Sequence, residues 1–177
     1  MIEVLDKSFE IFIKREEIGQ KVSSIAQRIN ADYEGKEIIF IAVLNGAFMF
    51  ASDLLKNIHV PCEISFVKMS SYQGTQTTGV VDELIGLNTD VEGKEVIIIE
   101  DIVDTGHTID KINTLLKGKN PNSIETCTLL YKPDAFKGIS KPNYVGFDIP
   151  NAFVVGYGLD YDQKGRNLDA LYQIREK

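Results

Sequence analysis

Acidic and small polar residues cluster directly after one strongly aliphatic segment of the chain. Residues 96–99 are all branched aliphatics, which is typical of a strand buried on both faces, and Glu100 and Asp101 come where that strand would surface. A turn of small polar residues, 104–108, then leads into apolar residues at helical spacing from Ile109 onward. In open parallel sheets, ligands bind outside the carboxyl ends of the strands, and a helix N-terminus offers N–H groups and a positive dipole end to an anion. We therefore expect the turn to hold a phosphate group.

The neighbouring carboxylates of Glu100 and Asp101 would repel each other unless a cation or hydroxyl groups lay close to them. Mg²⁺ prefers one or two carboxylates together with several waters and substrate phosphates, so the pair suits a magnesium site. Ribose hydroxyls would satisfy the same oxygens. Two solvated acids at the end of a strand are the plain alternative, which the aliphatic flank disfavours. Whether the acids bind a metal directly or only lie beside it stays open at this point.

Aliphatic strands alternate with amphipathic segments along the chain, which predicts one α/β domain over residues 1–177 with a mainly parallel central sheet and flanking helices. Helices are expected at residues 16–33, 47–58 and after the turn, and strands at 37–44, 63–69, 96–99, 124–131, 143–147 and 153–156. The polar segment at about 70–90 interrupts this rhythm, and long irregular insertions of this kind are usually lids or disordered. Within it, residues 80–87 could pair as a short two-stranded ribbon.

Composition and charge exclude several classes of protein. The formal net charge is −7 and no basic run is present, which argues against a nucleic-acid or anionic-membrane surface. No apolar run approaches the roughly twenty residues that span a bilayer, and no signal peptide is recognised. Cys62 and Cys127 lie in apolar, strand-like runs, so we expect reduced thiols in the core rather than a disulfide or a metal site. These features predict a cytoplasmic protein with no nucleic-acid or membrane partner.

The acidic pair, the aliphatic pair after it and the Asp-Thr-Gly-x-Thr turn resemble the signature of the purine phosphoribosyltransferases, in the hypoxanthine-guanine branch of the type I family. Further similar segments follow in family order over nearly the whole chain, at residues 43–47, 70–72, 130–132, 146–150 and 166–169. The resemblance implies the type I fold with a small, mobile hood at about 70–90. It also implies transfer of the phosphoribosyl group from 5-phosphoribosyl 1-pyrophosphate to hypoxanthine or guanine, giving IMP or GMP and pyrophosphate, with xanthine left open. Mg²⁺ as cofactor and a homodimer or homotetramer are implied in the same way.

On the purine side, the resemblance gives a role to each matching residue. Asp104 is similar to the catalytic proton acceptor at purine N7, although a short acid here could also cap a helix or form the turn. Lys132 would donate to the 6-oxo oxygen, which favours 6-oxopurines over adenine because an ammonium only donates. Phe153 resembles the stacking platform for the base and Val154 offers backbone groups to its edge, whereas a Phe in a strand is often plain core. The 5′-phosphate would be surrounded by Thr105, Gly106, His107 and Thr108, with His107 contributing only its backbone.

On the pyrophosphate side, the resemblance points to three further segments. The turn beside the pyrophosphate would be Leu44-Asn45-Gly46, offering backbone N–H groups through an unusual peptide geometry. Asn45 departs from the family, in which several relatives carry lysine, so only the backbone contact is carried over, and an ordinary Asn-Gly turn is the alternative. Ser71 and Tyr72 would close over the reacting centre. Arg166 is similar to a bidentate partner of pyrophosphate, and the metal region would be formed by Glu100, Asp101 and Asp160.

Two other classes of protein share some of these features. A phospho-acceptor receiver domain also gathers acids around a Lys-Pro pair, but its acidic pair lies on the first strand, well before a separate acceptor aspartate. Here Glu100 and Asp101 come only one strand before Lys132, which leaves no room for that order. A phosphoribosyltransferase-like regulator that binds nucleotides or RNA without catalysis is the second alternative, and the acidic net charge speaks against RNA binding.

Overall fold

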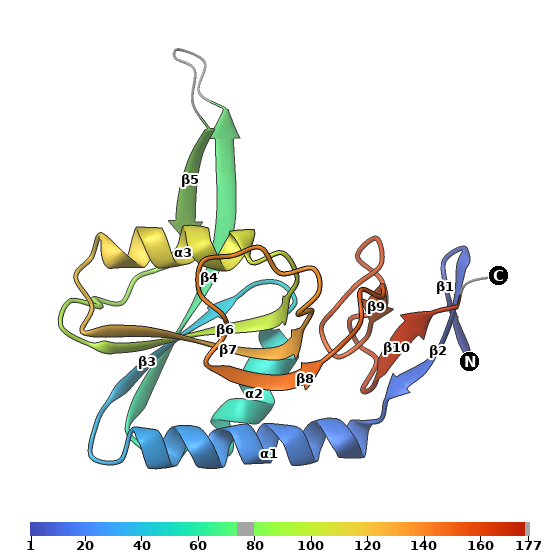
Figure 1. The fold of residues 1–177 in the computed structure, drawn as a ribbon, viewed down its shortest axis with the longest axis horizontal. Helices are drawn as coiled ribbons and strands as arrows, with labels where there is room; N and C mark the ends of the chain where they lie inside the picture. The colour runs from blue at the N-terminus through green and yellow to red at the C-terminus, as the bar shows by residue number, and fades with distance from the viewer. Residues whose placement is uncertain (74–79, 176–177) are drawn as a thin grey trace.

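The computed structural model describes residues 1–73 and 80–175, with side chains described for 1–69 and 85–175, and its central element is a six-stranded sheet (Figure 1). The strand order is β5-β4-β3-β6-β7-β8, and all neighbours are parallel except β5, which is antiparallel to β4. The strands are β3 (Ile38–Val43), β4 (Cys62–Gln73), β5 (Val80–Ile85), β6 (Glu95–Val103), β7 (Ser123–Tyr131) and β8 (Tyr144–Asp148). The predicted α/β fold with a mainly parallel sheet is confirmed.

Helices of the described residues cover both faces of this sheet, with α1 (Arg15–Asp32) and α2 (Phe48–Leu55) on one face and α3 (His107–Lys117) on the other (Figure 1). Successive residues of β6 point to opposite faces, as the pleat of a strand requires. Ile97 and Ile99 belong to the apolar cluster that contains the buried residues of α1 and α2, while Val96 and Ile98 pack with those of α3. The central strand is therefore buried on both faces, as its aliphatic run predicts.

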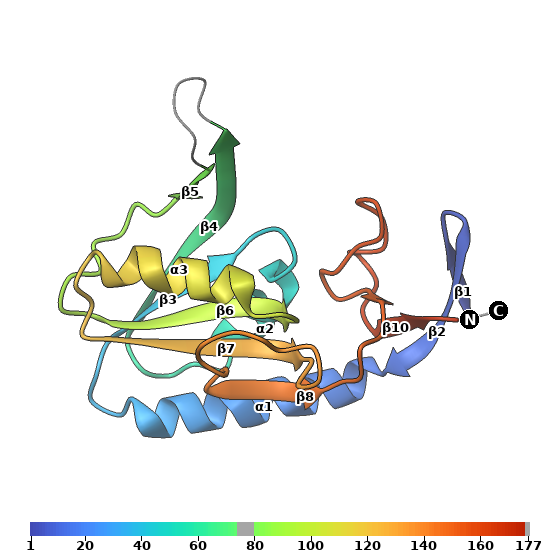
Figure 2. The same ribbon diagram turned by 45° about the horizontal axis from the view of Figure 1, so that its top comes forward.

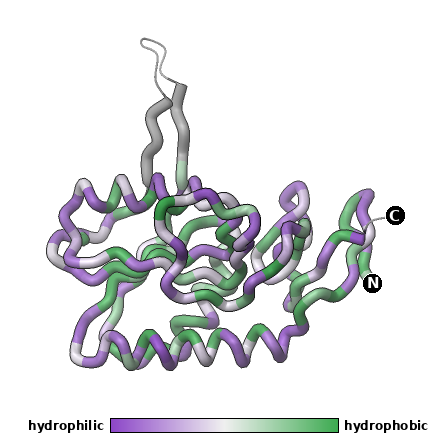
Figure 3. Tube along the Cα trace, in the orientation of Figure 1, coloured by the Kyte–Doolittle hydropathy of each residue, from purple (hydrophilic) through white to green (hydrophobic). Residues whose placement is uncertain are grey.

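The helix α1 follows directly from its amphipathic sequence. Polar and apolar residues alternate along it in Figure 3, and its apolar stripe packs on the sheet. Glu17 supports the first turn, because its carboxylate accepts a hydrogen bond from the Lys14 N–H at 3.2 Å and lies at the positive end of the helix dipole. The buried residues of α1 are Ile18, Val22, Ile25, Ala26 and Ile29.

A second, four-stranded sheet joins the two ends of the chain, and most of it was not predicted. Its strands are β1 (Ile2–Val4), β2 (Lys7–Ile13), β9 (Val154–Val155) and β10 (Leu171–Ile174), in the order β1-β2-β10-β9 with antiparallel pairs. Only β9 falls within a predicted strand. The core of this sheet is small and consists of Val4, Phe9 and Val155, with partly buried residues around them. Because β2 finds its partner β10 at the other end of the chain, no local pattern indicates the pairing.

The expectation of a long irregular insertion at about 70–90 is wrong for residues 70–73 and 80–85, which are strand. β4 continues to Gln73, and β5 pairs with it in register from Lys68 opposite Ile85 to Gln73 opposite Val80. This pairing agrees with the short ribbon expected at 80–87. Figures 1 and 2 show the ribbon projecting away from the body of the sheet. The part of the predicted hood at residues 74–79 lies outside the described residues.

The two cysteines differ from each other in burial. Cys127 is buried in β7, as predicted, whereas Cys62 at the start of β4 is exposed, which corrects the expectation of a second core thiol. The reason is its place in the sheet: β5 pairs with β4 only from Lys68 onward, so the first half of β4 is an edge. Both thiols are free. Among the residues that the structure describes, no helix combines the length and the apolar character needed to cross a membrane.

Candidate active site

The carboxyl end of β6 is open on one side, and this opening creates the candidate site. β3 pairs with β6 only as far as Ala42 opposite Ile99, whereas β7 follows β6 to Tyr131 opposite Val103. β3 ends at Val43, one residue after its last pair with β6, and the Leu44 N–H donates to the Val67 carbonyl of β4 at 2.8 Å. Residues of β6 after Ile99 therefore face a gap between strand ends, which is where open parallel sheets bind their ligands.

Glu100 and Asp101 lie at this opening, inside β6 rather than after it. Glu100 is only 6% exposed, and burial, with the Asp101 charge beside it, raises its pKa well above the ordinary value. Burial likewise raises the pKa of Asp101, to about 6, although the Ile102 N–H, which donates to its Oδ1 at 2.9 Å, and the Arg166 charge both act in the opposite direction. The two acids are thus more buried than the sequence suggested. They form a site that gains from a cation or from hydroxyl donors.

The raised pKa of Asp101 predicts how the stability of the metal-free protein depends on pH. The folded chain binds the Asp101 proton with a pKa of about 6, above the ordinary value of 3.8, so it holds this proton more tightly than the unfolded chain does between these pH values. Its contribution to the free energy of unfolding is therefore full below about pH 4 and is lost as the pH rises through about 6. The stability advantage of Asp101→Asn over the wild type is expected to grow by roughly 1 kcal/mol between about pH 5 and about pH 7.5.

Urea denaturation followed by circular dichroism, with a chelator present, measures this difference at the two pH values. Comparing the variant with the wild type at each pH removes the contribution of the titrating groups that do not interact with Asp101, whereas the coupled titration of Glu100 remains part of the difference. If the stability advantage of Asp101→Asn over the wild type had the same size at both pH values, the pKa of Asp101 would not be raised by burial as the structure indicates.

Gly46 packs tightly against the Asp101 carboxylate, and Gly158 packs tightly against Gly46. A Cβ at Gly46 would lie 1.6 Å from Asp101 Oδ2, and a Cβ at Gly158 would lie 2.0 Å from the Gly46 carbonyl oxygen. The peptide bond between Leu44 and Asn45 is cis, so the turn predicted to have an unusual geometry does have one. The turn 44–46 therefore lies between Asp101 on one side and the loop around Gly158 on the other. Nothing larger than glycine fits at either contact without movement.

Arg166 and Asp160 are paired with each other in this structure. Arg166 Nη2 lies 2.7 Å from Asp160 Oδ1, and Arg166 Nη1 donates to the Gly158 carbonyl at 2.9 Å. The second oxygen of Asp160 accepts a hydrogen bond from the Gln163 N–H at 2.8 Å. Arg166, the predicted partner of pyrophosphate, and Asp160, one of the three residues predicted for the metal region, thus lie close together, beside the turn 44–46. Among the described residues, no group of three or more His, Cys, Asp and Glu side chains could hold a metal by itself.

The turn after β6 leads directly into α3, as predicted. Gly106 is the N-cap of α3 with a φ of 87°, a left-handed conformation that favours glycine, and it has no side chain to bond the first N–H groups of the helix. His107 and Thr108 are exposed at the start of α3, in agreement with a backbone role for His107. The segment after β7 packs against this turn, because the Lys137 N–H donates to the Thr105 carbonyl at 3.0 Å. The helix N-terminus is open to an anion.

Replacing Gly106 with alanine is expected to destabilise the fold by about 1–3 kcal/mol, because a Cβ is disfavoured at positive φ and has no space here. The added Cβ would lie 2.5 Å from Cε2 of Phe136 and 3.0 Å from the Gly138 Cα. Gly118, at the other end of α3, is the matched control: its φ is −63° and an added Cβ finds nothing closer than 3.5 Å. Gly118→Ala is expected to be neutral or to stabilise by about 0.4–1 kcal/mol. Thermal and urea unfolding measure both, and equal effects would contradict the assignment.

Asp104 and Lys132 form an ion pair at the mouth of the site. Lys132 Nζ lies 2.7 Å from Asp104 Oδ2 and 3.4 Å from Asn151 Oδ1, and Lys132 is only 7% exposed. An ammonium has three donors, so these contacts leave one for a ligand. Asp104 keeps nearly half of its side chain exposed, which leaves its carboxylate accessible. The structure thus brings the predicted proton acceptor and the predicted 6-oxo donor into direct contact.

Phe153 is not a core residue. It is 47% exposed, and its ring lies edge-on to Tyr161 with 5.8 Å between centroids and 6.4 Å from the buried Phe9. The contacts with these two aromatic rings leave nearly half of Phe153 exposed, and an exposed ring can stack on a flat ligand. Val154 is buried in β9. The predicted residues Ser71 and Tyr72 belong to the backbone of β4, but their side chains lie outside the described part of the structure.

The fold and the site first define the class of protein. The sequence model described as the phosphoribosyl transferase domain matches residues 12–162 of this chain. The hypoxanthine-guanine phosphoribosyltransferase of Dictyostelium discoideum is 39% identical over 175 residues, covering 96% of this chain and 97% of that protein. The protein of the same name from Mycobacterium tuberculosis strain H37Rv is 42% identical over 168 residues, covering 91% and 83%.

A solved structure agrees with these relatives. The crystal structure of a hypoxanthine-guanine phosphoribosyltransferase from Bacillus anthracis superposes with a TM-score of 0.85 and 37% identity, covering 95% of this chain and all of that one. The chain therefore belongs to the hypoxanthine-guanine phosphoribosyltransferases. The resemblance found in the sequence is confirmed, and with it the expectation that the protein is a transferase.

Proposed function

We propose that this protein transfers the phosphoribosyl group of 5-phosphoribosyl 1-pyrophosphate to hypoxanthine or guanine, giving IMP or GMP and pyrophosphate in purine salvage. The observation that supports it most is the pair of Asp104 and Lys132, with 2.7 Å between Oδ2 and Nζ, beside the open N-terminus of α3. A 6-oxopurine presents an N–H and a carbonyl oxygen along one edge. An acceptor and a donor-only cation side by side are complementary to that edge.

In the proposed reaction, purine N9 attacks the anomeric carbon of the ribose while the bond to pyrophosphate breaks, with inversion. The N7 proton leaves the purine as N9 becomes bonded, and the Asp104 carboxylate accepts it. The transition state resembles an oxocarbenium ion and is electron-poor, so the site must neutralise the departing polyanion and hold the reactants in line. The N–H groups at the start of α3 would bind the 5′-phosphate, and the exposed ring of Phe153 would stack on the base.

Glu100 and Asp101 suit a divalent cation, and we propose Mg²⁺ for this site. Phosphoribosyltransferases generally use a divalent metal, which when bound would neutralise pyrophosphate charge. The raised pKa values of both acids fit such a role, because a nearby cation favours their ionised forms and so couples metal binding to proton release. Asp160 would have to exchange its contacts with Arg166 and Gln163 before it could take part. Direct ligation by Glu100 and Asp101 is part of the proposal, with ribose hydroxyls as the other partner of the same oxygens.

We extend the proposal to the remaining features of the chain. Residues 1–177 would act as one phosphoribosyltransferase domain, in which the ribbon of β4 and β5, with the segment at about 70–90, closes over bound substrates. The projection of this ribbon beyond the sheet supports such a role (Figure 2). The free thiols of Cys62 and Cys127 fit a reducing, cytoplasmic compartment. A homodimer or homotetramer is proposed from the family resemblance.

An assay with four purines tests the proposed function. Wild-type protein is incubated with 5-phosphoribosyl 1-pyrophosphate and either hypoxanthine, guanine, xanthine or adenine, with and without Mg²⁺, while pyrophosphate release and nucleotide formation are followed. We expect Mg²⁺-dependent release with hypoxanthine and guanine and far less with adenine, and the xanthine reaction decides the open preference. No turnover of any 6-oxopurine would reject the proposal and revive a regulator without catalysis, which the named relatives do not favour.

A further inference from the structure

The loop that follows β9 has a conformation that needs an external anchor. Gly156, Tyr157 and Gly158 are three successive residues with positive φ, at 100°, 48° and 102°. Glycine adopts this conformation freely, whereas a tyrosine in it is disfavoured unless surrounding contacts hold it. Tyr157 is only 4% exposed, so its side chain is well placed to provide such contacts.

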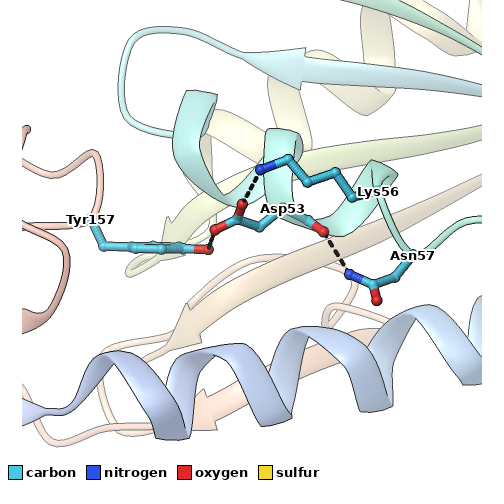
Figure 4. A network of polar contacts seen from close by, with 4 residues as sticks. All are labelled: Asp53, Lys56, Asn57 and Tyr157. Carbon is cyan, nitrogen blue, oxygen red and sulfur yellow. Dashed lines mark hydrogen bonds and ion pairs between the residues drawn. The ribbon is translucent and has the colours of Figure 1, made fainter.

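The anchor of Tyr157 is Asp53, on α2. The Tyr157 hydroxyl donates to Asp53 Oδ2 at 2.7 Å, and the other oxygen of Asp53 lies 2.8 Å from Lys56 Nζ (Figure 4). The carbonyl of Asp53 also accepts a hydrogen bond from the Asn57 side chain at 2.9 Å, which holds this end of α2 together. Although burial of Asp53 opposes ionisation, the bonds from Lys56 and Tyr157 keep its pKa below the ordinary value. The acceptor of the tyrosine hydroxyl is therefore a carboxylate, which makes the bond a strong one.

Both ends of this hydrogen bond lead to the pyrophosphate side of the site. α2, which carries Asp53, begins just after the turn 44–46. Gly158, next to Tyr157, packs so closely on this turn that a Cβ would lie 2.0 Å from the Gly46 carbonyl oxygen. The Gly158 carbonyl in turn accepts a hydrogen bond from Arg166 at 2.9 Å. The bond thus ties the turn that touches Asp101 to the loop that carries Asp160 and Arg166.

We propose that Tyr157 and Asp53 are positioning residues for the pyrophosphate-binding half of the site. Their hydrogen bond sets the spacing between the turn 44–46 and the loop 156–160, while neither side chain touches the reacting atoms. The purine-binding half depends on a different set of contacts, centred on the pair of Asp104 and Lys132. Loss of the hydrogen bond should therefore weaken the binding of 5-phosphoribosyl 1-pyrophosphate and leave the binding of the purine unchanged. This inference rests on the function proposed above.

The variant Tyr157→Phe tests the inference, because it removes the hydroxyl and keeps the ring. We expect the KM for 5-phosphoribosyl 1-pyrophosphate to rise roughly tenfold, as for loss of a hydrogen bond to a charged group. The KM for hypoxanthine and kcat should stay within about twofold of the wild type. Calorimetric titration of the protein with 5-phosphoribosyl 1-pyrophosphate and Mg²⁺, without purine, should show the same loss of affinity.

Three further variants separate positioning from plain structural support. Asp53→Ala should reproduce the selective effect of Tyr157→Phe, whereas Asp53→Asn keeps an acceptor oxygen for the hydroxyl and should restore most of the affinity. Lys56→Met is the matched control, since this ion pair is exposed and surface pairs contribute little. It should leave both KM values unchanged. Melting curves by circular dichroism verify folding, and if Tyr157→Phe fails to fold, the comparison of Asp53→Ala with Asp53→Asn carries the same test.

The possible failures can be told apart. If the wild type forms no nucleotide from any purine, the proposed function fails and the inference falls with it. If the wild type is active but Tyr157→Phe and Asp53→Ala change neither KM, the hydrogen bond does not position the site. An equal rise of both KM values, or a fall in kcat alone, would likewise overturn the inference, because either result describes a general loss of structure and not a selective one.

Discussion

Replacing Asp104 with asparagine is expected to lower kcat by about 10²–10⁴-fold, which is the usual contribution of a positioned general base. In the wild type the Lys132 ammonium lies 2.7 Å from the Asp104 carboxylate. The asparagine amide keeps the size of the side chain and an oxygen acceptor for this ammonium, but it cannot take up the purine N7 proton. The KM for 5-phosphoribosyl 1-pyrophosphate should change far less, because Asp104 contacts Lys132, which we propose to bind the purine. Steady-state kinetics with each substrate varied in turn measures both quantities.

The control for this prediction is Asp134→Asn, which removes the same charge from an exposed position in the segment after β7. It should leave kcat within about twofold of the wild type, since the charge of an exposed carboxylate is screened by solvent and salt. Equal losses of kcat and of phosphoribosyl-substrate affinity in Asp104→Asn would contradict the role of Asp104 as base. Such a result would favour its other reading, a turn or capping residue that holds the loop before α3.

Replacing Lys132 with methionine should lower kcat/KM for hypoxanthine and guanine by roughly 10–100-fold, because a hydrogen bond from a charged donor is worth about 1.5–3 kcal/mol. The change keeps an unbranched stem in the buried site and removes the three donors. The preference for 6-oxopurines over adenine should narrow at the same time. The Lys132 ammonium only donates hydrogen bonds, so it can bond a 6-oxo oxygen but not the amino group of adenine, and methionine removes this distinction. Competition assays with hypoxanthine and adenine measure this ratio.

The exposed Lys141 provides the matched control for Lys132→Met. Lys141→Met should alter neither the rate nor the purine preference. A Lys132→Met enzyme that still discriminates against adenine as strongly as the wild type would show that another group reads position 6 of the base.

Local sequence patterns predicted the central sheet and the turn between β6 and α3 well. The aliphatic run 96–99 could only be a strand buried on both faces, and the clusters on either side of β6 show that it is. The helical spacing in α1 was equally clear, and its buried stripe matches it. Patterns of this kind succeed because each reports which face of its own element must be removed from water.

Patterns failed where the partner of a segment lies far away along the chain. β2 and β10 come from opposite ends of the sequence, and neither has a strong alternation of its own. The exposure of a side chain depends on which elements cover it, so the apolar surroundings of Cys62 in the sequence suggested a core position that the fold does not give it. For Phe153 the sequence left a stacking platform and a core position open, and the fold exposes its ring. The importance of Asp53 was missed for the same reason, since its partner Tyr157 lies about a hundred residues later.

The sequence by itself determined the order of strands and helices in the central sheet, the burial of β6 and the presence of acids and a glycine turn at its end. Only the tertiary structure decided that Lys132 reaches Asp104, that Arg166 pairs with Asp160 and that Gly46 lies between Asp101 and Gly158. The physical reason is that burial periodicity is a property of each element alone. The distances between side chains of different elements are set by how all of them pack together.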